Sequence, residues 1–297
     1  MNEKKFNIIG IGEILWDIYN DKKYLGGAPA NFAIHCHQLG DNGIIVSQVG
    51  NDDLGQEVFD ALNKRGIDNR YIQVDSKNPT GTVEVKLDKN GKPQFNCTKD
   101  VAFDYLEVNT TLNELSLIAD AILFGTLAQR SDQSRESIQT FLRQSEHALK
   151  IYDINLRGWD NKTKEIVNQS LVFADAIKLN DDELRILNAA WQPSYDPISF
   201  LKYLITEFNL KFAALTRGEN GCILIGHDQV VELDGIKIKP LDTTGCGDAF
   251  AAALIRTFLQ EKPLKQIAAF SNLVGAYVAG FPGATPEYSI HDLEEFE

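Results

Sequence analysis

Basic residues and cysteines are both scarce in this chain, and each scarcity argues against a class of protein. Lys and Arg number 29 against 42 Asp and Glu, which gives a formal charge of -13 at pH 7. That balance argues against a surface for nucleic acid or an anionic membrane. The four cysteines form no C-x-x-C pair, and a chain of this size needs no disulfide staples, so we expect free thiols at Cys36, Cys97, Cys222 and Cys246. His35 and His37 flank Cys36, but on a helix residues two apart point in different directions, so we expect packing there rather than a metal site.

Targeting and membrane-spanning patterns are also missing. The opening MNEKKFNIIGIGEI has no basic region followed by a long apolar stretch. No run of about eighteen apolar residues occurs, which is the length that a membrane helix needs. We therefore expect a cytoplasmic protein.

Two familiar phosphate-binding motifs are absent as well. The P-loop pattern G-x-x-x-x-G-K-[ST] does not occur, and in GIGEIL at 10–15 Leu15 stands where a dinucleotide fingerprint needs its third glycine. Any phosphate chemistry must therefore use another turn.

The order of apolar segments predicts an α/β protein. Short apolar runs at 6–12, 44–50, 121–125, 150–155, 176–180 and 212–218 mostly alternate with amphipathic stretches such as 53–67 and 131–150. This alternation is typical of a parallel sheet covered by helices on both faces, where ligands bind beyond the carboxyl ends of the strands. We expect one domain over residues 1–297.

Two segments interrupt this alternation and predict a small separate β structure. Residues 12–27 and 80–97 have strand or hairpin character, with Asp88-Lys89-Asn90-Gly91 as a turn. We expect an antiparallel flap, a β lid drawn from about 12–27 and 80–104. Such a flap can close over a site or pair with a copy of itself in a homodimer.

The sequence DTTGCGD at 242–248 is the strongest functional signal. An apolar run follows it in which Phe250, Leu254 and Phe258 recur every four residues, so the turn opens a helix. The backbone N–H groups of Gly245, Cys246 and Gly247 can approach an anion closely there, and the helix dipole favours negative charge. Asp248 then lies where a carboxylate can act as a general base for a hydroxyl. The alternative is a plain helix cap, which needs one carboxylate and not a pair around a glycine turn.

The sequence GGAPAN at 26–31 is the second signal. Gly26 and Gly27 allow a ligand close to the backbone, and Asn31 offers a donor and an acceptor to a hydroxyl. Asp17, in the preceding strand, suits bidentate binding of sugar hydroxyls. A turn that merely starts a helix remains the alternative for GGAPAN.

These motifs resemble the two signatures of the ribokinase or PfkB family of carbohydrate kinases. The likeness covers essentially the whole chain, and GEILWD (12–17), LGGAPANFA (25–33), DINLR (153–157), KLNDDE (178–183) and LTRGENG (215–221) are most similar to the fructokinase branch. The resemblance implies a three-layer αβα fold with a mostly parallel central sheet and a β lid. It also implies that Asp248 deprotonates the sugar hydroxyl that attacks the γ-phosphoryl group of ATP.

The resemblance also assigns nucleotide and metal positions. It implies that Asn180 and Glu183 organise Mg²⁺ and the phosphates through water, which suits an ion that keeps much of its hydration shell. The nucleotide would lie against Thr216, Gly218, Gly221 and Asn272. Asp242 and Thr244 match positions that hold a monovalent cation in many members, while the tail GATPEY at 283–288 departs from the usual pattern and leaves a potassium requirement open. Cys246 replaces the usual Ala and offers a thiol to alkylation or oxidation.

Substrate contacts follow from the same resemblance. Arg157 and Lys99 match substrate-contacting positions, and Lys99 stands where many relatives have Arg, which weakens bidentate recognition of a carboxylate. We therefore expect a neutral sugar, fructose before 2-keto-3-deoxygluconate. A sugar-acid or nucleoside kinase, and a non-catalytic sensor of sugar or nucleotide, remain as alternatives; a sensor has no need of a base at Asp248.

Overall fold

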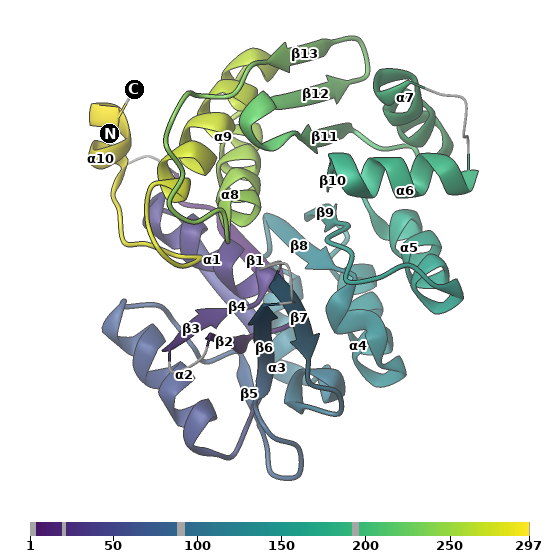
Figure 1. Cartoon of the computed structure of the whole chain (residues 1–297). Helices are drawn as coiled ribbons and strands as arrows, with labels where there is room; N and C mark the ends of the chain where they lie inside the picture. Colours follow the sequence, from purple (N-terminus) through teal and green to yellow (C-terminus); the bar gives the residue numbers. More distant parts are fainter. Residues whose placement is uncertain (1–3, 20–21, 88–92, 192–195, 297) are drawn as a thin grey trace.

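A nine-stranded sheet forms the middle layer of the protein (Figure 1). The computed structural model describes residues 4–19, 22–87, 93–191 and 196–296. The strand order is β13-β12-β11-β10-β9-β8-β1-β4-β5, parallel from β5 to β11 and antiparallel at β12 and β13. The strands are β1 (Asn7–Ile11), β4 (Asn42–Gly50), β5 (Ile72–Asp75), β8 (Ala121–Gly125), β9 (Leu149–Asp153), β10 (Ala176–Asn180), β11 (Phe212–Thr216), β12 (Cys222–Gly226) and β13 (Val230–Leu233). The mostly parallel sheet is as predicted.

Both faces of this sheet are covered by helices, which is why its strands are apolar almost throughout. In β1, Ile8 packs into the core on one face and Ile9 into the core on the other. Side chains alternate across a strand, so a strand buried on both faces needs apolar residues at successive positions. The three-layer αβα arrangement that the resemblance implied is therefore confirmed.

The helices divide between the two faces. On one face lie α1 (Ala28–Gln38), α2 (Asp53–Lys64), α8 (Cys246–Leu259) and α9 (Leu264–Ala279), with the C-terminal α10 (Ile290–Phe296) beside α9. On the other lie α3 (Thr110–Ser116), α4 (Asp132–Gln144), α5 (Asn161–Phe173), α6 (Asp181–Trp191) and α7 (Pro197–Phe208). Short 3₁₀ turns are η1 (Ala102–Tyr105), η2 (Leu127–Arg130) and η3 (Gly218–Asn220).

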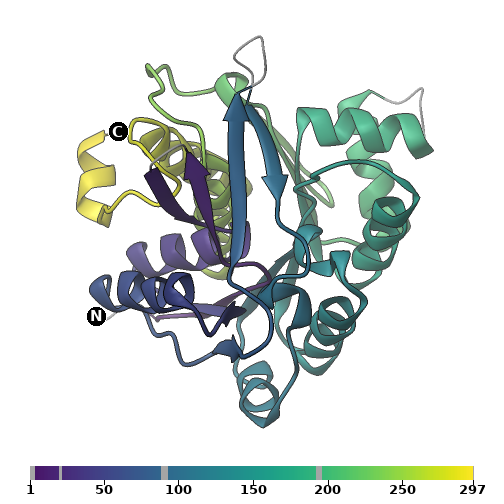
Figure 2. The same cartoon turned by 60° about the horizontal axis from the view of Figure 1, so that its bottom comes forward.

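A second, four-stranded sheet stands in front of the first (Figure 2). Its order is β3-β2-β6-β7, from β3 (Lys22–Gly26), β2 (Leu15–Tyr19), β6 (Gly81–Leu87) and β7 (Pro93–Cys97). The two hairpins are antiparallel, but β2 and β6 run parallel to each other. The predicted flap is thus a mixed sheet and not an antiparallel one, because the sequence between β2 and β6 crosses the main sheet before it returns. The predicted turn at Asp88–Gly91 lies outside the described residues.

Three further expectations, on cysteines, metal sites and membrane helices, can be compared with the structure. All four cysteines are free thiols. Within the described ranges, no group of three or more His, Cys, Asp and Glu side chains could hold a metal, and no helix is long and apolar enough to cross a membrane. The single domain and the homodimer through the flap stay predictions.

Candidate active site

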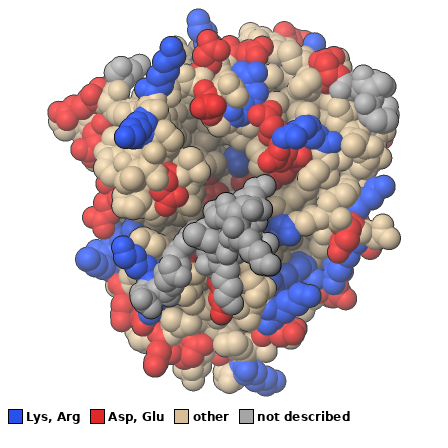
Figure 3. Space-filling model, in the orientation of Figure 1, with Lys and Arg blue, Asp and Glu red and all other residues tan. Residues whose placement is uncertain are grey.

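The predicted site residues converge where the chain reverses direction across the central sheet. Strand β1 lies between β4 and β8, so the chain first builds outward on one side of β1 and then on the other. A crevice forms at such a switch point, beyond the carboxyl ends of the strands. In Figure 3 the surface is hollowed between α8 and the ends of β9 and β10, with acidic and basic side chains at the rim.

The turn that opens α8 is held by close backbone contact. Gly245 has φ 76°, and a Cβ added to it would lie 2.2 Å from the carbonyl oxygen of Ala284, so only glycine fits. Asp242 fixes both sides of the turn: its Oδ1 accepts from the N–H of Thr244 at 2.9 Å and its Oδ2 from that of Gly283 at 2.9 Å. These hydrogen bonds lower the pKa of Asp242 although partial burial opposes them.

The C-terminal segment that backs this turn is itself fixed by a buried histidine. His35 lies 3.0 Å from the hydroxyl of Tyr288 through Nδ1 and 3.0 Å from the carbonyl oxygen of Ala284 through Nε2. Burial lowers the pKa of His35 to about 4, so it is neutral at pH 7. His35 is thus a packing residue, as the sequence predicted, and it holds the segment against Gly245.

Asp248 lies in the first turn of α8 and contacts the GGAPAN helix. The side-chain nitrogen of Asn31 donates to Oδ2 of Asp248 at 2.9 Å, which joins two motifs 217 residues apart. Desolvation is the main cause that raises the pKa of Asp248 to about 7, with a contribution from the charge of Asp153. Lys178, Asn31 and Arg157 oppose that rise. A base with a pKa near the working pH is well suited to proton transfer.

A buried ion pair, which the sequence analysis did not single out, lies next to the anion-binding turn. Lys178 in β10 and Asp153 in β9 are register partners, and Nζ of Lys178 donates to both carboxylate oxygens of Asp153 at 2.9–3.0 Å. A Cβ on Gly247 would lie 3.1 Å from that Nζ. Burial opposes the charge of Lys178, but Asp153, Glu183 and Asp248 together raise its pKa. The signal in the sequence was a charged residue within each of two apolar strands.

Asp17 in β2 reaches the site from the second sheet. Its Oδ2 would lie 2.2 Å from a Cβ on Gly26, and a Cβ on Gly27 would lie 2.4 Å from the carbonyl oxygen of Glu13. The glycine pair therefore makes room for the side chain of one acidic residue and the backbone of another. Desolvation raises the pKa of Asp17 to about 6, with Arg157 opposing and Asp242 assisting.

The two predicted substrate cations have different surroundings. Arg157 is exposed in the loop after β9, where its Nη1 donates to Asn155 Oδ1 at 2.9 Å, and its charge lowers the pKa of Glu13, Asp17 and Asp248. Lys99 is exposed in the bend after β7 and makes no hydrogen bond or ion pair within the described part of the chain. The structure thus brings the charge of Arg157 to the acidic cluster, while the contact of Lys99 with substrate stays a prediction.

Arg130 of η2 is the cation that supports this side, and the sequence analysis missed it. Its guanidinium pairs with both oxygens of Asp104 at 2.7 Å and lies 4.9 Å from the ring centroid of Phe103. It also donates to the carbonyl oxygen of Thr98, next to Lys99. No motif marks Arg130, because its role depends on the fold of η1 against η2.

Asn180 and Glu183 form a reciprocal cap at the start of α6. The N–H of Glu183 donates to Asn180 Oδ1, and the N–H of Asn180 donates to Glu183 Oε2, both at 2.9 Å. Glu183 Oε1 accepts from the N–H of Leu156, and burial raises the pKa of Glu183. Each oxygen keeps a free lone pair. This donor set fits a Mg²⁺ ion that is bound through water better than one bound directly by the protein.

The predicted nucleotide residues lie at the β11–β12 hairpin and on the adjacent helix. Gly218 (φ 54°) and Gly221 (φ 85°) adopt backbone conformations that favour glycine, and a Cβ on Gly221 would lie 2.0 Å from the carbonyl oxygen of Leu233. Thr216 Oγ1 donates to the carbonyl oxygen of Leu179 at 3.4 Å, and Asn272 on α9 donates to that of Asp234 at 3.3 Å. The hairpin and α9 are thus joined along one edge of the molecule.

The thiol of Cys246 is half-buried between two carboxylates. Burial raises its pKa to about 12, and the charges of Asp248 and Asp242 add to the effect. Because the thiolate is the nucleophile, a thiol that stays protonated at pH 7 is a poor target for alkylation.

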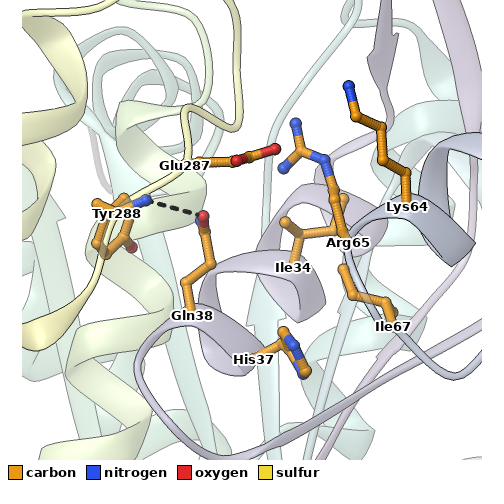
Figure 4. A pocket seen from close by; sticks show the side chains of 8 residues that line it. All are labelled: Ile34, His37, Gln38, Lys64, Arg65, Ile67, Glu287 and Tyr288. Carbon is orange, nitrogen blue, oxygen red and sulfur yellow. Dashed lines mark hydrogen bonds between the residues drawn. The ribbon is translucent and has the colours of Figure 1, made fainter.

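A separate hollow lies at the far end of α1 (Figure 4). Its lining combines α1, α2 and the C-terminal segment, with Lys64, Arg65 and Glu287 at its mouth, and it includes none of the predicted site residues. Arg65 there donates to the carbonyl oxygen of Thr285 at 2.9 Å. The hollow therefore lies next to the segment that supports the catalytic turn, but apart from the cleft.

Comparison with known proteins extends over nearly the whole chain. The model of the pfkB family carbohydrate kinases matches residues 12–290. The chain is 32% identical over 292 residues to an uncharacterized sugar kinase of Pyrococcus horikoshii, covering 91% of this chain and 88% of that protein. The structure of that kinase in complex with ATP is similar with a TM-score of 0.77, over 94% of this chain and 95% of the other, at 31% identity.

A plant sequence is similar as well. The probable fructokinase-7 of Arabidopsis thaliana is 29% identical over 280 residues, which cover 89% of this chain and 81% of that protein. Since the family model spans both signatures and the second sheet, the chain belongs to the pfkB family of carbohydrate kinases and is a phosphotransferase whose acceptor is a hydroxyl group of a sugar.

Proposed function

We propose that this protein uses ATP to phosphorylate the primary hydroxyl of a neutral sugar, fructose to fructose 6-phosphate. The observation that carries the proposal is Asp248, a carboxyl group with a pKa near 7 in the first turn of α8, directly after the glycine turn. A sensor without catalysis needs no such base.

The chemical step follows from the arrangement of the turn. Asp248 accepts the proton of the sugar hydroxyl as its oxygen attacks the γ-phosphorus of ATP, and ADP leaves. The N–H groups of Gly245, Cys246 and Gly247 bind the phosphoryl oxygens, assisted by the charge of Lys178 next to the turn. Phosphoryl transfer depends mainly on position and electrostatic stabilisation, and this turn is held in place by backbone contact.

The nucleotide would lie along the edge formed by the β11–β12 hairpin and α9. Thr216, Gly218, Gly221 and Asn272 are proposed to contact it, and the uncharacterized sugar kinase of Pyrococcus horikoshii, 31% identical, has been solved with ATP. Asn180 and Glu183 would hold Mg²⁺ through water. When bound, the ion would neutralise phosphate charge.

The proposal includes a monovalent cation site at Asp242 and Thr244, beside the anion-binding turn. The lowered pKa of Asp242 keeps its carboxylate ionised, as a cation ligand must be. Its oxygens already accept hydrogen bonds from the N–H groups of Thr244 and Gly283. A potassium requirement therefore remains a prediction, to be tested by replacing K⁺ with tetramethylammonium in the assay.

The choice of fructose rests on the sugar side of the cleft. Asp17 and Asn31 offer acceptors to hydroxyl groups. An Arg at position 99 could bind a carboxylate in bidentate fashion, but this chain has the exposed Lys99 there. The similarity to a plant fructokinase points the same way. A sugar acid would also meet the acidic cluster of Asp17 and Asp248, which repels it.

The test is an ADP-release assay with a panel of acceptors. We expect kcat/KM for fructose to exceed that for ribose, adenosine and 2-keto-3-deoxygluconate by a factor of tens to thousands, since two unpaired buried polar groups cost roughly 1–3 kcal/mol each. A sugar acid or nucleoside that is preferred would overturn the assignment to fructose alone. No phosphorylation of any sugar in a broad panel would overturn the kinase activity.

A further inference from the structure

Glu13 is a buried acidic residue that the proposed reaction does not yet use. It lies between the end of β1 and the start of β2, and only 3% of its surface is exposed. Its Oε2 atom has no hydrogen-bond partner within the described residues. A buried carboxylate oxygen without a donor is unfavourable, and native proteins seldom keep one without a reason.

The position of Glu13 is fixed by its backbone. Its carbonyl oxygen packs so closely on Gly27 that a Cβ there would approach to 2.4 Å, and the neighbouring carbonyl of Gly12 accepts a hydrogen bond from Ser47 Oγ at 2.6 Å. The side chain is therefore presented from a rigid part of the sheet, at the switch point between β4 and β8.

Glu13 interacts electrostatically with ionisable groups from four other elements. Burial raises its pKa to about 7, the backbone N–H groups of Glu13 and Ala28 and the charge of Arg157 in the loop after β9 oppose the rise, and Asp248 of α8 adds to it. Glu13 in turn acts on Arg130 of η2 and on Cys97 of β7. Glu13 therefore lies close enough to the proposed base, the exposed arginine and the second sheet for their charges to interact.

We propose that Glu13 is a further substrate-binding residue, whose carboxylate accepts a hydrogen bond from a sugar hydroxyl other than the one that is phosphorylated. The buried Oδ1 of Asn31 also lacks a partner within the described residues, so a bound sugar that reaches both side chains would find two acceptors for its hydroxyl donors. This inference rests on the proposed sugar kinase function. It makes Glu13 a determinant of which sugar is accepted, because a sugar without that hydroxyl leaves the carboxylate unpaired.

The test pairs variants of the residue with variants of the substrate. The wild type, Glu13→Gln and Glu13→Ala are assayed with the preferred sugar and with monodeoxy analogues that each lack one non-reacting hydroxyl. In the wild type, one analogue should lose about tenfold or more in kcat/KM. In Glu13→Ala that ratio should shrink to below about threefold, and Glu13→Gln, which keeps one acceptor oxygen, should lie between them.

Gln129→Ala is the matched control. Gln129 is fully buried in η2, its Oε1 also lacks a partner, and its amide nitrogen bonds Gly125 and Ser170 away from the cleft. It should leave every deoxy ratio unchanged. Thermal unfolding of all variants identifies any that fail to fold, and the near-isosteric Glu13→Gln keeps the test decisive.

Two results would overturn the inference and separate its causes. If the wild type discriminates among the analogues and Glu13→Ala keeps every ratio, Glu13 has only a structural role or holds a water molecule, and the kinase proposal stands. If the wild type phosphorylates no sugar, the proposed function fails and the role of Glu13 fails with it.

Discussion

The two sides of the cleft are held in different ways. On one side, the turn before α8 is locked by backbone contact between Gly245 and Ala284, by both oxygens of Asp242, and by His35 behind the C-terminal segment. On the other side, the described part of the β6–β7 hairpin contributes Val83 and Cys97 to a small cluster with Leu15, Val101 and Phe103. The side that carries the base is locked by backbone contacts, while the described part of the β6–β7 hairpin joins one small apolar cluster.

This difference suggests a division of work. Phosphoryl transfer is favoured when the groups that stabilise the transferred charge are already in position. The backbone contacts of the turn before α8 hold its N–H groups in this way. Closure over a sugar requires an element that can adjust, and few buried apolar contacts make adjustment cheap. The predictions below test each half of this comparison.

The largest effect should come from Asp248→Asn. The amide keeps the shape of the side chain but accepts no proton, so we expect kcat to fall on the order of 10²–10⁴-fold while ATP binding stays nearly intact. Steady-state kinetics and a nucleotide titration measure the two quantities. A variant that kept more than about a tenth of the wild-type kcat would remove Asp248 from the role of base.

Gly245→Ala should damage the rigid side next most. Its new Cβ would lie 2.2 Å from Ala284 oxygen, so the turn must shift, which costs about 1–3 kcal/mol beyond the penalty for a positive φ. Gly66→Ala is the matched control, because Gly66 has φ +68° and nothing within 4 Å of its Cβ position. Chemical denaturation and kcat are measured for both.

The rigidity of the turn is refuted if the two alanine variants lose equal stability and Gly245→Ala retains full kcat. Loss of stability without loss of kcat would show that the contact with Ala284 supports the fold but not the reaction.

Asp17→Asn should change the way in which Tm depends on pH. The pKa of Asp17 is raised to about 6 from its usual 3.8, so the folded state binds this proton more tightly than the unfolded state does. That contribution to stability is complete below about pH 4 and is lost as the pH rises through about 6. Relative to the variant, the wild type should therefore lose Tm between about pH 4 and 7 and change little above that range.

The exposed Asp228, between β12 and β13, supplies the control Asp228→Asn. Its Tm should follow that of the wild type across the same range. A constant difference in Tm between Asp17→Asn and the wild type would mean that Asp17 is not desolvated in the folded protein. Other groups, among them His35 with its lowered pKa, cancel in this difference.

The smallest effect should appear in amide exchange. We expect residues 12–27 and 80–97 to exchange more slowly when the sugar binds, and to change less with nucleotide alone, because closure of the second sheet would exclude water. The buried strand β8 serves as the reference that does not change. Equal exchange in both segments at saturating sugar would remove the lid from the mechanism.

Much of the main sheet could be predicted from the sequence because its signals are local. Six apolar runs that were predicted as strands are parallel strands of the main sheet: β1, β4, β8, β9, β10 and β11. The two signature turns are the starts of α1 and α8. The hairpins of the second sheet were also predicted. Their parallel junction at β2 and β6 was not, because strands about sixty residues apart pair only after the chain has crossed the main sheet.

The candidate site was predicted less completely. Lys178 and Asp153 meet because β9 and β10 align in one particular register, and Arg130 reaches Asp104 only through the packing of η2 on η1. Glu13 lies in the GEILWD segment that carries the resemblance, but it was given no role there, because its burial depends on the fold. Lys99, chosen by resemblance, is exposed, and its role in substrate binding stays a prediction.

The sequence by itself determined the local chemistry: where glycine allows a turn to approach an anion, which residue follows that turn as the base, and which segments are strands. The pKa values of the buried carboxyl groups, in contrast, depend on the tertiary structure. The pKa of Asp248, Glu13 and Asp17 rises because side chains from several distant elements exclude water around them. Desolvation and register depend on neighbours that are far away in the chain, so no local pattern contains them.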